Sequence, residues 1–164
     1  MPHIFKNEEM EFTQVDPPIP EFAWHSSQRF SEITKSKHLA FDIRSLDPGK
    51  FSYPYHFHRA AEELFYIISG EATLRTPNGF TKVEKGDLVF FEEGESSAHQ
   101  IRNHSNEVCV YLDIRTSPEI DICEYPDSGK VNIIPGMGIF ERSSAVSYFK
   151  GEDNVADNWP VEEE

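Results

Sequence analysis

Residues 55–70 read Tyr55-His56-Phe57-His58-Arg59-Ala60-Ala61-Glu62-Glu63-Leu64-Phe65-Tyr66-Ile67-Ile68-Ser69-Gly70. Side chains alternate between the two faces of a β-strand, so His56 and His58 are predicted to project from the same face. Glu63 opens the apolar run that follows and can meet them from a neighbouring strand. Two imidazoles and a carboxylate that converge in this way are typical of a site for one divalent metal ion.

The same stretch has a simpler interpretation. A His-x-His pair on a strand is often two solvated or hydrogen-bonded histidines, because short motifs recur by chance. The carboxylate is also ambiguous: Glu62 and Glu63 are adjacent, so they lie on opposite faces and only one of them can point inward. The motif alone therefore leaves both the metal and its carboxylate ligand open.

The composition restricts the class of protein. The 164 residues include 15 Lys and Arg against 29 Asp and Glu, for a net charge of −14. This acidity argues against nucleic acid and anionic membrane surfaces as partners, since both require clustered positive charge. No apolar run approaches the roughly 20 residues that span a bilayer, and the N-terminus lacks the basic start and apolar core of a signal peptide. We expect a cytoplasmic protein, in which Cys109 and Cys123 are reduced and form no metal or redox pair.

Strand-like runs separated by turn signals fill residues 39–115. The first, Leu39–Leu46, is closed by Asp47-Pro48-Gly49, and Asn78-Gly79 is a strong hairpin signal. The other runs are residues 51–58, 63–69, 71–75, 80–84, 88–91, 99–103 and 108–114. Eight short strands with no helical periodicity between them predict an all-β fold, and a double-sheet jelly roll suits their number.

Less regular segments flank this barrel. Residues 1–38 are predicted to form an extended N-terminal arm, because Asp16-Pro17-Pro18-Ile19-Pro20 cannot lie inside a helix or a central strand. The arm packs either on the barrel or on a partner subunit. Residues 116–164 form a C-terminal extension, with a loop or single helical turn at 117–121, a polar turn-rich stretch at 124–130, a strand at 131–134, and a solvated acidic tail that ends in Glu162-Glu163-Glu164.

A second motif strengthens the interpretation of the first as a metal site. Residues 86–103 resemble the second motif of the cupin superfamily, and residues 49–70 resemble its first motif: a glycine, then His-x-His, a glutamate and a glycine. The resemblance implies a small cupin barrel, a double-stranded β-helix, in which four side chains bind one metal ion. Position by position, those four places fall to His56, His58, Glu63 and His99. Glu63 has the family spacing, and Glu62 stays the alternative.

The chain departs from the family pattern in its turns. Six residues rather than five separate Gly49 from His56, Glu92 stands where the second motif usually has proline, and the loop from Gly94 to His99 is longer by two residues. Turns tolerate changes of length, so these departures concern loop shape and not the ligands. The proline-containing arm and Tyr125-Pro126-Asp127-Ser128-Gly129-Lys130 resemble a bacterial branch of single-domain cupins, which implies a fold and a metal but no substrate.

The resemblance and the ligand types together indicate a range of functions. Three imidazoles and one carboxylate suit Fe, Mn, Ni or Zn and leave positions for water, substrate or dioxygen. We expect a metal-dependent enzyme acting on a small organic molecule, with dioxygenase-, isomerase- or decarboxylase-like chemistry. The alternatives are a non-catalytic barrel that binds or senses a small molecule, and a metal that only stabilises the fold. The resemblance also implies a homodimer.

Strand alternation predicts what surrounds the metal. Phe65 and Ile67 share the face of Glu63, and Ile101 and Asn103 share the face of His99, so the pocket is predicted to be mostly apolar, with no obvious inward Arg or Lys to hold an acidic substrate. The facing of Arg75, Arg102 and Arg115 stays open, and a solvated surface position is expected for them. The remaining histidines are expected to lie outside the ligand set: His3, His25, His38 and His104.

Overall fold

A computed structural model describes residues 1–158 of the chain. Its strands are β1 Phe12–Val15, β2 Trp24–Ser27, β3 Leu39–Leu46, β4 Phe57–His58, β5 Glu63–Ser69, β6 Glu71–Thr76, β7 Gly79–Glu84, β8 Leu88–Phe91, β9 Gln100–Arg102, β10 Cys109–Thr116, β11 Asp121–Tyr125, β12 Lys130–Ile134 and β13 Gly138–Glu141. The helical segments are short: α1 Phe30–Thr34 and the 3₁₀ turns η1 Asn7–Glu9, η2 Glu95–Ser97, η3 Arg142–Ser144 and η4 Val155–Asn158.

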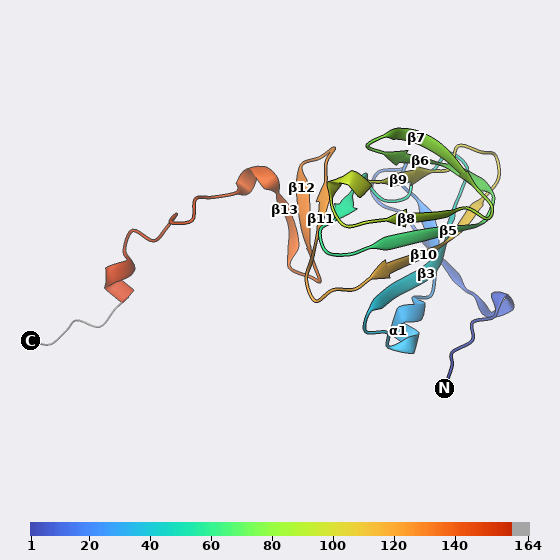
Figure 1. The fold of residues 1–164 in the computed structure, drawn as a ribbon, viewed down its shortest axis with the longest axis horizontal. Helices are drawn as coiled ribbons and strands as arrows, with labels where there is room; N and C mark the ends of the chain where they lie inside the picture. Colours follow the sequence, from blue (N-terminus) through green and yellow to red (C-terminus); the bar gives the residue numbers. More distant parts are fainter. Residues whose placement is uncertain (159–164) are drawn as a thin grey trace, which may run out of the picture.

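The strands form two walls around one interior (Figure 1). One wall is a six-stranded sheet in the order β1-β2-β3-β10-β5-β8. The other consists of two smaller sheets, β13-β12-β11-β4 and β7-β6-β9, which an antiparallel bridge between His56 and His99 connects. This is the all-β jelly roll that the strand-like runs and turn signals of the sequence predict. Strands β3 to β10 correspond to the eight expected strands.

The predicted run over residues 51–58 is mostly not a strand. Only Phe57 and His58 form β4, because Pro54 has no backbone N–H to donate to a ladder. The segment still follows β9 through single hydrogen bonds, from Ser52 N to Ile101 O at 3.0 Å and from His56 N to His99 O at 3.1 Å. Its path is therefore set by a neighbouring strand even where it lacks regular structure.

The region after residue 116 differs most from expectation. The predicted strand at 131–134 is present as β12, but β11 is an additional strand that takes in the end of the predicted loop at 117–121 and the start of the turn-rich stretch at 124–130. β11 lies between β12 and β4 and pairs Cys123 with His58. The sequence does not indicate this strand, because its inward residues lack the apolar alternation that marks a strand. The structure thus places a strand from the C-terminal extension beside the first motif.

The N-terminal segment packs on the barrel of its own chain. β1 pairs with β2, and β2 pairs with β3 at the edge of the large sheet. Helix α1, which the sequence did not indicate, packs its buried Phe30 near Phe41 of β3. The acidic residues Glu162-Glu163-Glu164 lie outside the described residues. In the described part of the chain, no helix has the length and apolar character needed to cross a bilayer.

The core fills the interior of the barrel and extends to His99, on which Phe91 stacks with 3.7 Å between ring centroids. It consists of buried side chains from both walls: Leu46, Phe65, Ile67, Ala72, Leu74, Val83, Phe91, Ile101, Cys109 and Tyr111. Phe65 and Ile67 face inward with Glu63, and Ile101 and Asn103 with His99, as alternation predicts. Burial of these side chains stabilises the walls that carry the polar groups, at about 1.5–3 kcal/mol for each large one.

Gly70 joins β5 to β6 in a place where no other residue fits. Its φ is +74°, and a Cβ there would lie 2.4 Å from Val108 O and 2.9 Å from Cys109 Cα. The backbone of β10 therefore approaches directly over the point where the chain leaves β5. This close contact fixes the end of the strand that starts at Glu63.

We predict that Gly70→Ala destabilises the protein by several kcal/mol, because a positive φ costs about 1–2 kcal/mol and overpacking adds about 1–3 kcal/mol. Urea unfolding followed by circular dichroism measures the loss. Gly49→Ala is the matched control, since Gly49 has a φ of +79° with nothing within 4 Å of the added Cβ. Equal losses in the two variants would refute the role given to the β10 contact.

Candidate metal centre

The backbone itself brings two of the predicted ligands together. His56 N donates to His99 O at 3.1 Å, and His99 N donates to His56 O at 2.8 Å. Residues that exchange both hydrogen bonds in an antiparallel bridge carry their side chains on the same face. The two imidazoles accordingly lie with their ring centroids 4.7 Å apart, although 43 positions separate the residues in sequence. The first and second motifs thus meet through main-chain hydrogen bonds.

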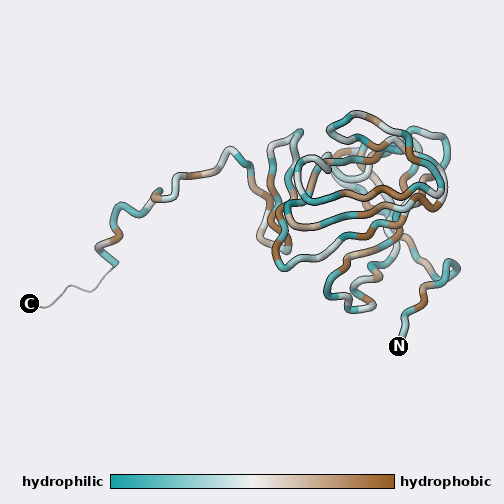
Figure 2. Tube along the Cα trace, viewed as in Figure 1, coloured by the Kyte–Doolittle hydropathy of each residue, from teal (hydrophilic) through white to brown (hydrophobic). Residues whose placement is uncertain are grey.

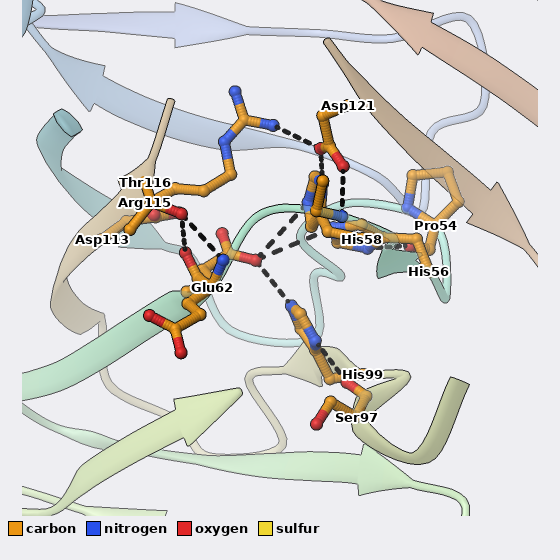
Figure 3. Close-up of polar contacts among 12 residues, drawn as sticks. Pro54, His56, His58, Glu62, Ser97, His99, Asp113, Arg115, Thr116 and Asp121 are labelled. Atoms are coloured by element: carbon orange, nitrogen blue, oxygen red, sulfur yellow. Dashed lines mark hydrogen bonds and ion pairs between the residues drawn. The ribbon is translucent and has the colours of Figure 1, made fainter. Parts of the chain in front are cut away.

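The other two predicted ligands complete the cluster (Figure 3). Glu63 Oε2 lies 3.1 Å from His99 Nε2, 3.8 Å from His58 Nε2 and 4.0 Å from His56 Nε2. All four side chains are buried. His58 comes from β4 and Glu63 from the first position of β5, so the cluster spans both walls of the barrel. The structure brings His56, His58, Glu63 and His99 to one place.

Each imidazole is held by its other nitrogen. Nδ1 of His56 lies 2.9 Å from Pro54 O, Nδ1 of His99 lies 2.9 Å from Ser97 O, and Nδ1 of His58 lies 2.5 Å from Asp121 Oδ2. These carbonyl and carboxylate oxygens can only accept, so each Nδ1 donates and each neutral ring leaves Nε2 as a lone pair. Metal-binding histidines are oriented by such bonds. The three free lone pairs face the carboxylate of Glu63.

One of these lone pairs and the carboxylate oxygen that it faces lack a donor among the described residues. Glu63 Oε2 and His99 Nε2 are buried and make no hydrogen bond, despite their separation of 3.1 Å. An unpaired buried acceptor costs about 1–3 kcal/mol, and several that face one another also repel. A divalent cation would satisfy all of them, because it replaces the missing donors with one charge. The residues present therefore fit a metal ion.

The electrostatics keep these groups in the protonation states that bind metal. Burial, together with the neighbouring His99, lowers the pKa of His56 to about 3, so this imidazole is neutral. Burial alone would raise the pKa of Glu63, but His99 and the other imidazoles lower it below its ordinary value. At neutral pH the cluster thus presents unprotonated nitrogen and an ionised carboxylate, and no proton has to leave these two groups before a cation enters.

Strand β11 contributes a second set of side chains, which sequence reasoning missed. Asp121, Cys123 and Tyr125 alternate onto the inner face of β11. Asp121 accepts from His58, Cys123 pairs directly with His58 across the sheet, and the Tyr125 ring stacks at 6.1 Å from the His56 ring. Burial raises the pKa of the Cys123 thiol to about 12. The only sequence signal for β11 is that Asp, Cys and Tyr occupy alternate positions. A search for alternating apolar residues does not detect it.

A cavity of about 320 Å³ opens beside the cluster. Its walls are more polar than predicted, because β3 and β10 turn charged groups inward: Asp42, Arg44, Asp113 and Arg115. The expectation of a pocket without inward Arg or Lys is therefore wrong. Arg44 is neutralised by ion pairs with Asp42 and Asp113, and it stacks 4.6 Å over the Tyr53 ring. Mutual pairing allows these charges to lie on an inner strand face.

Asp113 and Arg115 have different surroundings in this cavity. Asp113 is fully buried; burial and the neighbouring charges of Glu63 and Asp42 raise its pKa well above the ordinary value, against the opposing effect of Arg44. Arg115 makes a looser ion pair: its guanidinium lies 3.9 Å from the Asp121 carboxylate, and its side chain is 25% exposed. Of the two arginines, Arg115 is therefore held less tightly by carboxylates than Arg44.

The remaining candidates lie elsewhere. The exposed Glu62 is directed away from the imidazoles, and its backbone N–H bonds Thr116 (Figure 3). His25 bonds Asp47 at 3.1 Å, and His104 lies beside Thr73 and Glu71 on the outer surface. Neither histidine faces the cavity. Glu63 is therefore the carboxylate that the fold directs inward.

Comparison with known proteins identifies the class of protein. Residues 43–115 match the family model described as the cupin domain. Residues 43–115 therefore form a cupin domain. No curated protein matches the chain.

Solved structures share the fold at low sequence identity. A candidate sugar phosphate isomerase from Acidithiobacillus ferrooxidans superposes with a TM-score of 0.74 at 23% identity, over 88% of this chain and 95% of that one. A sugar phosphate isomerase from Silicibacter pomeroyi gives 0.69 at 19% identity, over 76% and 81%. A predicted oxalate decarboxylase from Thermotoga maritima gives 0.59 at 20% identity, over 71% and 100%. These likenesses establish the fold.

We predict that the metal-free protein loses stability as the pH falls from about 6.5 towards 3. The unfolded chain protonates His56 near its ordinary pKa of about 6.5, whereas the folded chain resists until about 3, so acid favours unfolding by up to about 1.4 kcal/mol per pH unit. Urea unfolding in chelator at several pH values measures the slope. His56→Asn should flatten it over this window, whereas the surface variant His104→Asn should not. An unchanged slope in His56→Asn would contradict the assignment.

Proposed function

We propose that the protein binds one divalent metal ion through His56, His58, Glu63 and His99 and acts as a metal-dependent enzyme on a small organic molecule. The observation that carries this proposal is the set of three Nε2 lone pairs, each oriented by an Nδ1 hydrogen bond, around one buried carboxylate. A bound divalent ion supplies a Lewis acid that can polarise a substrate oxygen. The open cavity beside the cluster supports a catalytic site over a metal that only stabilises the fold.

The cavity supports an anionic substrate. Arg115 points into it with a loose carboxylate partner, and a guanidinium binds carboxylate or phosphate oxygens through two parallel hydrogen bonds. Tyr53 lies beside Arg44, and burial raises the pKa of its hydroxyl to about 12, so this group keeps its proton and can donate to a substrate. Arg115 would orient the molecule while its other end meets the cluster.

The proposed ligand set is compatible with three reaction types. The ligand set suits Fe, Mn, Ni or Zn, and dioxygenase-, isomerase- and decarboxylase-like reactions all use such centres. Two of the similar structures are named for sugar phosphate isomerisation and one for oxalate decarboxylation, and both names describe anionic substrates. The alternative function is a non-catalytic cupin that binds or senses the same kind of molecule in the same cavity.

A homodimer is part of the proposal, and the outer face of the large sheet supports it. Alternation puts apolar side chains outward on adjacent strands: Leu64 and Tyr66 on β5, Leu88 and Phe90 on β8, and Leu112 and Ile114 on β10. The register places Leu64 beside Phe90 and Tyr66 beside Leu88, so the face is continuous, and Figure 2 shows the hydrophobic character of β5 and β8. Continuous exposed apolar faces of this kind mark protein interfaces. A second copy provides a face of the same chemistry, as a two-fold interface requires.

We predict that the purified protein binds one divalent ion per chain, and that His99→Ala weakens this binding by more than about a hundredfold, since loss of a ligand should exceed the 10–100-fold effect of an outer-shell change. Elemental analysis and competition with a chromophoric chelator measure both quantities. A turnover screen of phosphorylated sugars, small carboxylic acids, diketones and phenols under air should find activity that chelation abolishes.

His104→Ala is the matched control, because it removes a histidine outside the cluster and should change neither binding nor turnover. Wild-type protein that binds no metal would overturn the proposal. Metal binding combined with chelator-insensitive ligand binding and no turnover would favour the non-catalytic alternative.

We predict that Phe90→Glu converts the homodimer to monomers, because it places a charge on the apolar face beside Leu64, where Phe90 is 51% exposed. Sedimentation velocity measures the oligomeric state. Phe80→Glu is the control, since Phe80 is 75% exposed but lies on β7 of the opposite wall. A monomeric wild type, or equal dissociation in both variants, would show that this face forms no dimer.

A further inference from the structure

We propose that Cys123 is a fifth metal ligand, which binds through its thiolate on the side of His56 and His58. This inference rests on the proposed metal function and adds to it a residue outside the matched cupin domain, residues 43–115. The sequence predicts no metal role for Cys123, because its spacing from Cys109 is not that of a metal-binding cysteine pair. Its place in the structure is what singles it out.

The register of β11 against β4 directs Cys123 to the cluster. Cys123 is the antiparallel partner of His58, and directly opposed residues carry their side chains on one face. Since His58 faces inward, Cys123 does as well. It is 2% exposed and lies in the wall of the cavity. Asp121, two residues earlier on the same face, fixes the neighbouring ring.

The distances permit ligation. Cys123 Sγ, one ring nitrogen of His56 and one of His58 all lie within 4.8 Å of one another. A second group of the same kind contains His56, Glu63 and His99, so the two groups share His56. With metal–nitrogen and metal–sulfur bonds of about 2.1 and 2.3 Å, ligands on opposite sides of one ion lie about 4.4 Å apart. Small side-chain movements therefore bring one ion within reach of the thiol as well.

A second observation points to a ligand in this place. Glu63 Oε2 and His99 Nε2 are buried acceptors without a donor, so a cation is needed beside them irrespective of Cys123. Three imidazoles and a carboxylate would hold the ion, and Cys123 would add a fifth ligand to them. A substrate or water would approach the ion from the cavity. On binding, the Sγ–H bond breaks, the proton passes to solvent, and a sulfur–metal bond forms.

Thiolate ligation would also affect which metal binds. Thiolate is a soft ligand that favours zinc over manganese, whereas carboxylate and water suit manganese. With Glu63 and Cys123 both ionised, the two negative charges neutralise a divalent ion. Removing the thiolate should consequently weaken zinc more than manganese.

Cobalt(II) substitution tests the proposal without any substrate. A thiolate bound to cobalt gives an intense near-ultraviolet charge-transfer band, which imidazole and carboxylate ligands do not give. We expect this band in the wild type and its loss in Cys123→Ala, with one cobalt per chain retained in both. Cys109→Ala is the matched control, because Cys109 is the other buried free cysteine and belongs to the apolar core; it should keep the band. Zinc affinity should fall about tenfold or more in Cys123→Ala, in the range of site-tuning changes, with manganese affinity little changed.

The outcomes separate this inference from the proposed function. Wild-type protein that binds cobalt without the band, or Cys123→Ala that keeps it, shows that Cys123 only lines the cavity, and the four-ligand site stands. Protein that binds no cobalt, zinc or manganese overturns both proposals. Should Cys123→Ala fold poorly, Cys123→Ser provides the same test, because it keeps the volume of the side chain and lacks the charge-transfer band.

Discussion

The pair of backbone hydrogen bonds between His56 and His99 is the constraint on which the site depends. It connects two small sheets into one wall, and it places two imidazoles side by side from motifs far apart in sequence. Pro54 precedes it, lacks a donor, and supplies the carbonyl that fixes the His56 ring. The same short segment therefore closes the barrel and orients a candidate ligand. Function at this position is built from main-chain geometry as much as from side chains.

Around this bridge, the polar groups lie where paired partners compensate for their burial. Arg44 reaches the inner face only with Asp42 and Asp113 beside it, and His58 only with Asp121. Charged groups without partners would cost several kcal/mol each in such a place. Four buried side-chain atoms make no hydrogen bond among the described residues: Tyr111 Oη, Asp113 Oδ2, Glu63 Oε2 and His99 Nε2. The last two face each other inside the histidine cluster, and this pair of acceptors is the strongest physical reason to place a cation there.

Much of this could be predicted from the sequence, and the reasons for failure are local. Alternation predicted the inward direction of Phe65 and Ile67, since apolar residues on a strand face the core. The same alternation turned Glu63 inward, where the cupin-like motif accounts for a carboxylate. It did not predict β11 or the direction of Arg44, because inner faces near the site carry Asp, Cys, Tyr and Arg instead of apolar residues. Pro118 and Pro126 lie on either side of β11, and prolines at such positions favour a loop over a strand. The rule fails where the interior is a site rather than a core.

The position of β11 has a consequence for how such proteins are compared. The matched domain ends at residue 115, yet the carboxylate that orients His58 stands at residue 121. Two relatives with identical motifs can therefore differ in the basicity of one candidate ligand and in the floor of the cavity, because the strand that determines both lies beyond the shared boundary. Chemical divergence between them would be sought in the extension, where motif searches do not reach.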